Sequence, residues 1–342
     1  MKCPGSSPDK PSLTRRGLIV GAGASAAALA AYPVWRSLSG RERVFLARHQ
    51  RYDGSQLVRT ITDGLLATGV KPDDVRARRV LLKPNLVEPT RDCPHMTTHP
   101  AMILAAAEVF RRWGADVVVG EGPGHLRDTE VALLESGVSE ALATEKLRFA
   151  DLNYEDVRWV ENRGGVSNLP GFYFPQSVVE ADLVVSMPKM KTHHWVGFTA
   201  AMKNMYGVIP GSVYGWPKNV LHHNGIPETV FDINASLPKT IAIVDAIDCM
   251  EGDGPIMGSL KKMGLVLVGA NPTAVDATVS RLMGLAPDRI GYLQLAKNRL
   301  GPLCNPRIMQ VGERWESSAS PFAVLDQPHL RDLRVGDGPL VT

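Results

Sequence analysis

The chain has 342 residues, of which 44% are hydrophobic and 21% charged, enough to bury the core of one large domain or two smaller ones. Its formal charge is +3, and this excess comes entirely from the first 31 residues, which carry four basic side chains and one acidic side chain. The rest is balanced and has no basic run. This argues against nucleic acid as the main partner, because binding to a phosphate backbone needs clustered Lys and Arg.

The N-terminus carries the pattern of an export signal. Thr14–Ile19 contains the twin arginines, and it leads into an apolar, alanine-rich run from Leu18 to Ala31 with small residues near its end. We therefore expect residues 1–31 to be a twin-arginine (Tat) signal peptide. The expected partner is the Tat export machinery and the expected location periplasmic or extracellular. The run is shorter than the roughly 20 residues that span a bilayer, so we expect no stable membrane span, and an uncleaved anchor is the less favoured alternative.

Beyond the signal, short apolar runs alternate with amphipathic patterns. The predicted strands are Val44–Ala47, Val80–Leu82, Asp116–Val119, Leu183–Val185, Thr240–Val244 and Leu265–Val268. The predicted helices are Gln56–Ala67, Ala101–Trp113, Thr129–Ser136, Gly197–Tyr206, Glu228–Ser236, Thr273–Met283 and Ile290–Arg299. The alternation predicts an α/β domain over residues 42–301, with a mainly parallel sheet between helices in three layers.

The segments between and after these elements complete the predicted organisation. Pro- and Gly-rich stretches at 164–175 and 207–227 are either loops or a small inserted subdomain. A C-terminal extension, residues 302–342, contains a predicted closing strand at Ile308–Val311. Thr98 is placed to cap the helix that opens near Pro100, and Gly114 to end it.

Ionisable or glycine-rich residues follow four of the predicted strands. Lys83 and Asn85 follow the second strand, Glu121 the third, the segment 187–194 the fourth and Asp245 the fifth. Ligands of open parallel sheets bind outside the carboxyl ends of the strands, so we expect these residues to form one site. The alternative for each end taken singly is an ordinary polar surface loop.

The segment after the fourth strand is the richest in ionisable groups. In an extended backbone Lys189, Lys191 and His193 would share one side, where they could hold a carboxylate or phosphate. Repulsion between the two ammonium groups could lower the pKa of one lysine toward that of a general base. A solvated basic loop is the alternative.

The helix expected next should bury one face and offer polar groups on another. The spacing predicts a core face from four apolar residues, Trp195, Phe198, Met202 and Met205. Lys203 and Asn204 are its polar contribution, and Gly207 is placed to end it.

Histidines at two other places in the sequence each have more than one interpretation. His99 lies beside a helix N-terminus, where it could meet an anion or cap the turn, and of the adjacent His222 and His223 at most one should serve the site.

Four carboxylates lie within nine positions, at Asp245, Asp248, Glu251 and Asp253. They lack the spacing of an EF-hand. Salt-bridge partners, acid/base groups, ligands for a divalent metal and a solvated acidic turn all remain open for them. The candidate metal ligands are His193, Asp245, Glu251 and Asp253.

The cysteines bear on the remaining cofactor question. Cys3, Cys93, Cys249 and Cys304 are widely scattered, without C-x-x-C or ferredoxin spacing. We therefore do not expect an iron–sulfur cluster bound by this chain alone. Cys3 falls within the signal; two of the others could pair in an oxidising compartment, or all could stay free thiols.

Taken in order, these motifs resemble those of the domain of unknown function family 362. The resemblance rests on Lys83–Asn85, Thr98–Pro100, Gly120–Pro123, Pro188–His194, Lys203–Gly207, Glu251–Gly258 and Ala274–Asp276. It covers roughly residues 79–301 and supports treating these positions as one site. Family members are sometimes fused to ferredoxin-like modules and described as iron–sulfur proteins, a role that this cysteine-poor chain does not inherit.

Two functions follow as hypotheses. The first is an exported enzyme that acts on a small anionic substrate, by proton transfer as in an isomerase or racemase or by metal-assisted hydrolysis. The second is a non-catalytic protein that binds a small ligand or cofactor, or serves a redox partner. The candidate catalytic residues are Lys191, His193, Asp245 and Glu251. The candidate binding residues are Lys83, Asn85, His99, Glu121, Lys189, His194, Lys203, Asn204 and Asp253.

Overall fold

A computed structural model describes residues 40–125 and 127–341, and the fold below is that of the compact unit Glu42–Thr342. Ten strands of this part of the chain form one mixed sheet. They are β1 (Glu42–Arg48), β2 (Arg79–Lys83), β3 (Asp116–Glu121), β4 (Arg148–Asp151), β7 (Leu183–Ser186), β8 (Lys189–His193), β9 (Gly197–Thr199), β10 (Thr240–Glu251), β11 (Ser259–Gly269) and β12 (Ile308–Gly312).

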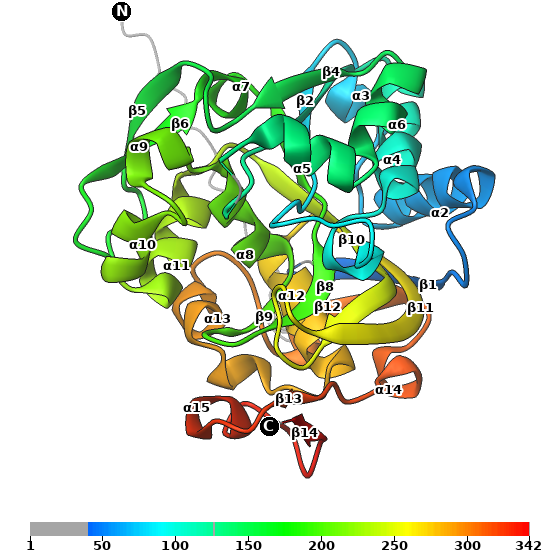
Figure 1. The fold of residues 1–342 in the computed structure, drawn as a ribbon. Coiled ribbons are helices and arrows are strands. Elements are labelled where there is room, and N and C mark those ends of the chain that lie inside the picture. Colours follow the sequence, from blue (N-terminus) through cyan, green and yellow to red (C-terminus); the bar gives the residue numbers. More distant parts are fainter. Residues whose placement is uncertain (1–39, 126, 342) are drawn as a thin grey trace, which may run out of the picture. The chain divides into compact units, whose positions relative to one another are not determined.

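The main path of the sheet runs β12-β1-β11-β10-β7-β2-β3-β4, with β8 attached to β10 and β9 attached to β8. Figure 1 labels β1, β2, β4 and β8 to β12 of this sheet. From β10 to β4 every neighbouring pair is parallel. β11 runs antiparallel to both of its neighbours, and β12 pairs with β1 in parallel. The predicted mainly parallel sheet is confirmed, and four of the strand ends singled out in the sequence belong to adjacent strands.

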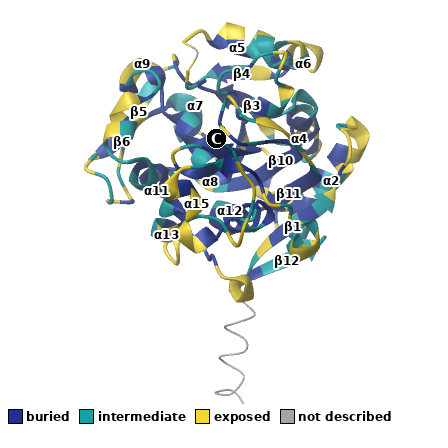
Figure 2. Ribbon diagram, turned by 60° about the horizontal axis from the view of Figure 1, so that its bottom comes forward, coloured by how far each residue is buried: buried dark blue, intermediate teal, exposed yellow. Residues whose placement is uncertain are grey.

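Helices cover both faces of the sheet, because each central strand is apolar on both sides. In β2, Val80 and Leu82 join the core on one face, and Leu81 joins the core on the other. The first face is covered by α2 (Gly54–Ala67), α4 (Pro100–Arg112) and α6 (Val138–Thr144). The second is covered by α8 (Ala201–Asn204), α11 (Ile226–Ser236), α12 (Pro272–Leu282) and α13 (Gly291–Ala296). The three-layer prediction is confirmed, and Figure 2 shows buried residues in the central strands and on the inner sides of these helices.

Shorter elements complete the unit. The remaining helices are α3 (Pro72–Val75), α5 (Thr129–Glu135), α7 (Gln176–Val179), α9 (Gly211–Tyr214), α10 (Asn219–His223), α14 (Trp315–Ser318) and α15 (Pro328–Arg331). Single 3₁₀ turns are η1 (Pro94–Met96), η2 (Met205–Val208), η3 (Pro287–Arg289) and η4 (Asn305–Arg307). Two small sheets pair β5 (Val157–Glu161) with β6 (Gly171–Pro175), and β13 (Val324–Leu325) with β14 (Leu340–Val341).

Several local predictions need correction. The segment Lys189–His193 is a strand rather than a loop, because β10 continues far enough to pair with it. The helix expected at Gly197–Tyr206 is instead β9, α8 and η2 in succession. The Pro- and Gly-rich stretches hold β6 and the short helices α9 and α10. The closing strand predicted at Ile308–Val311 is present as β12.

The start of α4 differs from the prediction by one residue. Its cap is His99, whose Nδ1 accepts a hydrogen bond from the Ala101 N–H at 3.1 Å. Thr98 instead donates its hydroxyl to the Met187 carbonyl oxygen at 2.6 Å, which ties the loop after β2 to the end of β7. Pro100 opens the helix and Gly114 follows it with a φ of +81°, both as expected. Within the described residues, no helix is both long and apolar enough to cross a membrane.

Candidate functional site

A cavity of about 280 Å³ lies beyond the carboxyl ends of β2 and β3. This volume is close to the lower end of the range of roughly 300–1,000 Å³ for small-molecule pockets. Its polar lining comes from segments far apart in the sequence: Lys83, Asn85, Glu121, His125, His193, His194, Thr199, Lys203, Asn204, Lys218 and His222. The parallel strand ends therefore carry a ligand-sized cavity, where the fold rule predicts one.

The floor of the cavity is a buried ion pair. The Lys83 ammonium at the end of β2 contacts the Glu121 carboxylate at the end of β3, and both side chains are almost fully buried. Lys83 also donates to the Pro84 carbonyl oxygen at 2.9 Å and to Asn204 Oδ1 at 3.0 Å. Burial lowers the pKa of Lys83 and raises that of Glu121, and their mutual attraction opposes both shifts.

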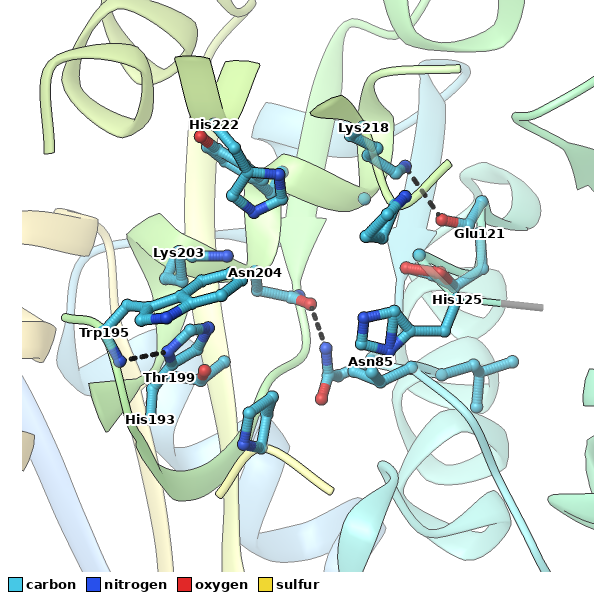
Figure 3. Close-up of a pocket in the computed structure, with 18 of the residues that line it drawn as sticks. Asn85, Glu121, His125, His193, Trp195, Thr199, Lys203, Asn204, Lys218 and His222 are labelled. Carbon is cyan, nitrogen blue, oxygen red and sulfur yellow. Dashed lines mark hydrogen bonds between the residues drawn. The ribbon is translucent and has the colours of Figure 1, made fainter. Parts of the chain in front are cut away.

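Asn204 on α8 joins this floor to the neighbouring strand, and its amide orientation is determined by its partners. Its Nδ2 donates to the Lys83 carbonyl oxygen at 3.0 Å and to Ser186 Oγ at 3.1 Å. A carbonyl oxygen only accepts, so Nδ2 must face it, and Oδ1 must face the Lys83 ammonium. Asn85 Nδ2 donates to the same Oδ1 at 3.2 Å (Figure 3). This turns Asn85 Oδ1 away from Asn204.

The turn after α8 passes so close to the floor that it needs a glycine. A Cβ at Gly207 would overlap the Lys83 ammonium and the Glu121 carboxylate. Gly207 lies inside η2 rather than at the end of a helix as the sequence suggested. Its role is the close approach of backbone to a buried ion pair.

One wall of the cavity is formed by residues on and after β8. Figure 3 shows His193, Trp195, Lys203 and His222 on this side. His193 Nδ1 accepts from the Trp195 N–H at 3.2 Å, so in the neutral ring Nε2 carries the proton. Trp195 was expected in the core with Phe198, but 53% of it is exposed, and its ring packs edge-on against His222 at 5.1 Å between centroids.

Lys203 projects from α8 into this wall. Its ammonium lies 4.0 Å from the centre of the Tyr206 ring. Within residues 40–125 and 127–341 it has neither a carboxylate partner nor a hydrogen-bond acceptor. Burial, followed by the positive charge of Lys83, lowers the pKa of Lys203 to about 7. An amine in this state can donate or accept a proton near neutral pH.

The opposite wall comes from the segments after β3 and before α10. Lys218 is buried and donates to the carbonyl oxygens of Gly122 at 3.0 Å and Ile209 at 2.5 Å. The contact with Gly122 holds the segment 205–222 against the end of β3, and the contact with Ile209 lies within that segment. Burial lowers the pKa of Lys218 to about 7. His125 faces the cavity beside Glu121 (Figure 3), and its Nδ1 lies 3.5 Å from a Glu88 carboxylate oxygen.

Three histidines at the cavity, His125, His193 and His222, are held neutral. Burial lowers the pKa of His193 well below its ordinary value and that of His222 to about 4, and Lys203 adds to both shifts. Burial also lowers the pKa of His125. Neutral imidazoles and partly protonated lysines therefore surround one space, and a negative charge placed there would stabilise the protonated lysines.

A buried carboxylate fixes the start of α8. Asp276 accepts the N–H groups of Ala201 at 2.7 Å and Met202 at 3.0 Å. Burial raises the pKa of Asp276 to about 7, and these two hydrogen bonds oppose the rise. Asp276 thus positions the single helical turn that carries Lys203 and Asn204.

Three of the predicted site residues form a separate buried cluster. Lys189 donates to Asp245 Oδ2 at 2.6 Å, and the Tyr52 hydroxyl donates to Asp245 Oδ1 at 3.0 Å. The ring of His99 stacks on that of Tyr52 at 3.7 Å between centroids, and the His99 N–H donates to Asp245 Oδ2 at 3.0 Å. None of these side chains lines the cavity.

The alternation along β8 therefore does not bring its two lysines together with His193 at one ligand. Lys191 is buried and donates to the Met96 carbonyl oxygen at 2.8 Å. Burial, with the neighbouring Lys189 and Lys203 charges, lowers the pKa of Lys191 well below its ordinary value. Of the three residues on that side of the strand, only His193 lines the cavity.

The later carboxylates do not line the cavity either. Glu251 accepts from the Ala323 N–H at 2.9 Å and lies 3.2 Å from the Lys261 ammonium. Asp253 is half-exposed and lies 3.6 Å from His194 Nδ1. Of the predicted site carboxylates, only Glu121 lines the cavity, and Asp245 pairs with Lys189 in the separate cluster.

The metal candidates are also dispersed. In the part of the chain that the structure describes, no three His, Cys, Asp or Glu side chains gather as metal ligands. Cys93, Cys249 and Cys304 are free thiols, and Cys249 is fully buried. The twin-arginine segment and Cys3 lie outside the described residues.

Three residues that line the cavity were not predicted from the sequence: Lys218, His125 and Thr199. Lys218 lies in the segment already noted for its two histidines, of which His222 lines the cavity and His223 does not. That neighbourhood was the available signal. His125 follows the glycine-rich end of β3, and its position in a loop without periodicity offered no further clue.

The topology and this cavity define a three-layer α/β protein with a ligand-sized site at the carboxyl ends of parallel strands. The chain belongs to the domain of unknown function family DUF362, whose pattern matches residues 80–281. This confirms the resemblance seen in the sequence.

Known proteins that are similar to the chain include a curated relative and a solved structure. The thylakoid-associated protein sll1697 of Synechocystis sp. is 26% identical over 294 residues, which cover 80% of this chain and 87% of that protein. The lactate racemase apoprotein from Thermoanaerobacterium thermosaccharolyticum aligns with a TM-score of 0.44 and 12% identity, over 71% of this chain and 57% of that chain. The chain thus spans less than two thirds of the latter protein, and a likeness of this size says nothing about activity.

Proposed function

We propose that this protein is an enzyme that binds a small carboxylate or phosphate in the cavity and moves a proton on it with Lys203 and His193. The observation that carries the proposal is the Lys203 ammonium, which faces the cavity without an acceptor among the described residues and has a pKa of about 7. A lysine that served only to neutralise an anion would gain nothing from a pKa near neutrality, whereas a general acid or base works best there.

The neutral His193 supplies a complementary group. Nε2 carries the proton, because Nδ1 accepts the backbone hydrogen bond from Trp195, and this Nε2–H has no hydrogen-bond partner among the described residues. A neutral imidazole that donates into a cavity can stabilise negative charge developing on a substrate oxygen. Lys203 as a neutral amine would then take the proton from the adjacent carbon, and as an ammonium it would return one. Isomerisation or racemisation beside a carboxylate has this form.

The lysines that line the cavity determine its net charge. Lys83 already neutralises Glu121, so the remaining charge of the lining comes from Lys203 and Lys218. A bound anion would raise the pKa of both lysines and be held by them. Metal-assisted hydrolysis, the other reaction considered from the sequence, needs ligands that the described residues do not gather, and we derive no step through a metal.

The location of this activity rests on the N-terminal sequence. The twin arginines at Arg15 and Arg16, followed by the apolar run, support export by the Tat route. We propose that the folded protein acts in the periplasm or outside the cell.

The proposal can be tested with protein purified from the cytoplasm. Thermal unfolding is measured with a panel of small carboxylates, inorganic phosphate and neutral analogues, and those that stabilise the protein are incubated with it in D₂O. Proton NMR then follows exchange of carbon-bound hydrogen for deuterium. We expect stabilisation by a subset of anions and exchange that is abolished in Lys203→Met and reduced at least about tenfold in His193→Phe.

Lys262→Met is the matched control, because Lys262 is exposed on β11 and does not line the cavity. It should exchange hydrogen at the wild-type rate. Stabilisation without exchange would leave an anion-binding protein and overturn the catalytic part of the proposal. Stabilisation that persists unchanged in both cavity variants would overturn the site itself.

A further inference from the structure

The cavity offers two hydrogen-bond acceptors that no group among the described residues satisfies. Asn85 Oδ1 and Glu121 Oε2 are both shielded from bulk water, and neither has a partner there. Both residues are more than nine-tenths buried and line the cavity. Buried acceptors left without a donor are costly, so their position beside a ligand-sized space calls for a donor on the ligand.

The orientation of the Asn85 side-chain amide is determined by its hydrogen-bond partner. The Lys83 carbonyl oxygen fixes Asn204 Nδ2, and Asn204 Oδ1 in turn requires a donor from Asn85. Asn85 must therefore use its nitrogen for Asn204 and has its oxygen left over. Glu121 is similar, because its Oε1 contacts Lys83 and its Oε2 has no hydrogen bond of ordinary geometry among the described residues, although the nearby Gly122 N–H also lowers the pKa of this carboxyl.

The wall formed by residues on and after β8 offers donors instead. The Lys203 ammonium and His193 Nε2–H lie on that side, across from Asn85 and Glu121 (Figure 3). A ligand that satisfies both sets of groups needs an anionic group for the donors and a hydrogen-bond donor for the acceptors. A simple anion would satisfy only the donors, Lys203 and His193.

The charge of the lining decides which kind of donor fits. Glu121 is the only carboxylate among the described residues that line the cavity, and Lys83 neutralises it. Lys203 and Lys218 add positive charge on either side. A ligand ammonium would therefore be repelled, whereas a neutral hydroxyl would not.

We propose that the ligand is a hydroxylated anion, whose acidic group faces Lys203 and His193 and whose hydroxyl donates to Asn85 Oδ1 or Glu121 Oε2. This inference rests on the proposed function, since it names the substrate class of the same cavity. It excludes plain acids and amino acids as preferred ligands. The carboxylate and phosphate forms share this chemistry.

The test compares ligands that differ by one substituent. Dissociation constants are measured by titration calorimetry for butanoate, 2-hydroxybutanoate and 2-aminobutanoate, and for propyl phosphate and 2-hydroxypropyl phosphate. We expect each hydroxylated ligand to bind about 5- to 140-fold more tightly than its plain partner, which is the effect of satisfying one buried acceptor. The pair that binds shows whether the acidic group is a carboxylate or a phosphate.

Variants locate the preference. Asn85→Ala removes one acceptor, and Glu121→Gln replaces the free carboxylate oxygen by an amide nitrogen when its oxygen stays on Lys83. We expect at least one of them to bind plain and hydroxylated ligands within about twofold of each other, while Asn305→Ala, an exposed control on η4, keeps the wild-type preference.

The outcomes separate this inference from the proposed function. Equal binding of plain and hydroxylated acids would overturn the inference and leave an anion site standing. Tighter binding of 2-aminobutanoate would also overturn it. If no acid or phosphate binds at all, both proposals fail. A hydroxyl preference that survives in both variants would show that the donor meets another group, which contradicts the assignment to Asn85 and Glu121.

Discussion

Replacing Lys203 by Met should stabilise the protein at neutral and acidic pH. The pKa of this lysine falls from 10.5 to about 7 in the folded state, so the unfolded chain binds more protons between these values. Native stability then rises with pH across that window, and the deficit caused by Lys203 is fully present below about pH 7. Met has no charge to desolvate and keeps an unbranched stem of similar size.

The size of the stabilisation expected for Lys203→Met follows from the lowered pKa of Lys203. Each pKa unit corresponds to about 1.36 kcal/mol, and we halve the result because Lys203 is partly exposed to the cavity. The penalty removed by Met is then about 2 kcal/mol at pH 6, about 1.5 kcal/mol at pH 8 and below about 1 kcal/mol at pH 9.5. The variant also loses the contact between the Lys203 ammonium and the Tyr206 ring, which reduces its gain in stability by about 0.5–1 kcal/mol. The expected net gain is about 1–2 kcal/mol at pH 6 and close to zero at pH 9.5.

Urea unfolding at these three pH values measures the difference directly, because all other titrating groups are common to both proteins. Lys262→Met serves again as control and should change stability by less than about 0.5 kcal/mol at every pH. A variant that is less stable at pH 6, or a difference that does not shrink toward pH 9.5, would show that Lys203 is not a desolvated cation in the folded protein.

Two further substitutions test the two buried ion pairs, Lys83–Glu121 and Lys189–Asp245. Gly207→Ala should reduce the free energy of unfolding by about 3–5 kcal/mol, because the added Cβ displaces the buried Lys83 ammonium from its partner. Gly54→Ala is the control: its Cβ would meet nothing within 4 Å, so the variant should be neutral or stabilised by up to about 1 kcal/mol. Equal urea midpoints for the two variants would show that Gly207 is not needed for the close approach to the ion pair. Asp245→Asn should cost a similar amount by leaving Lys189 without its carboxylate, as judged by urea unfolding. It should leave ligand affinity of the folded protein unchanged, so a weaker binding isotherm would place Asp245 in the ligand site.

The strand ends were predictable because their signal is local. Lys83 and Glu121 each follow a run of apolar residues, and the rule that parallel strands end at one edge brings them together without knowledge of the strand order. Asn204 could be selected from its polar position beside Lys203. The family motifs pointed to the same positions.

The partners across the site were not predictable, because they depend on how far strands extend. β10 continues beyond Val244 to Glu251, so Asp245 lies within a strand opposite Lys189 rather than in a loop facing the cavity. The same extension carries Glu251 to Lys261 and Ala323. Side-chain alternation alone could not show that each lysine of β8 meets a different acceptor.

The wall that contains Lys218 was not predicted from the sequence, for a different reason. Residues 205–222 form short turns with no sustained period, and their placement depends on tertiary contacts such as the bonds from Lys218 to the Gly122 and Ile209 carbonyl oxygens. Such contacts leave no periodic trace in a sequence. They become visible only once the end of β3 is in place.

The cavity lining spans residues 83 to 255, which has a consequence for folding kinetics. No short fragment of the chain contains the whole lining, and its groups meet only after pairing between distant strands, the slowest kind of contact to form. A ligand should therefore bind the native state and not earlier folding intermediates. It would slow unfolding while leaving the folding rate unchanged, and ligand binding would report the completion of folding rather than its onset.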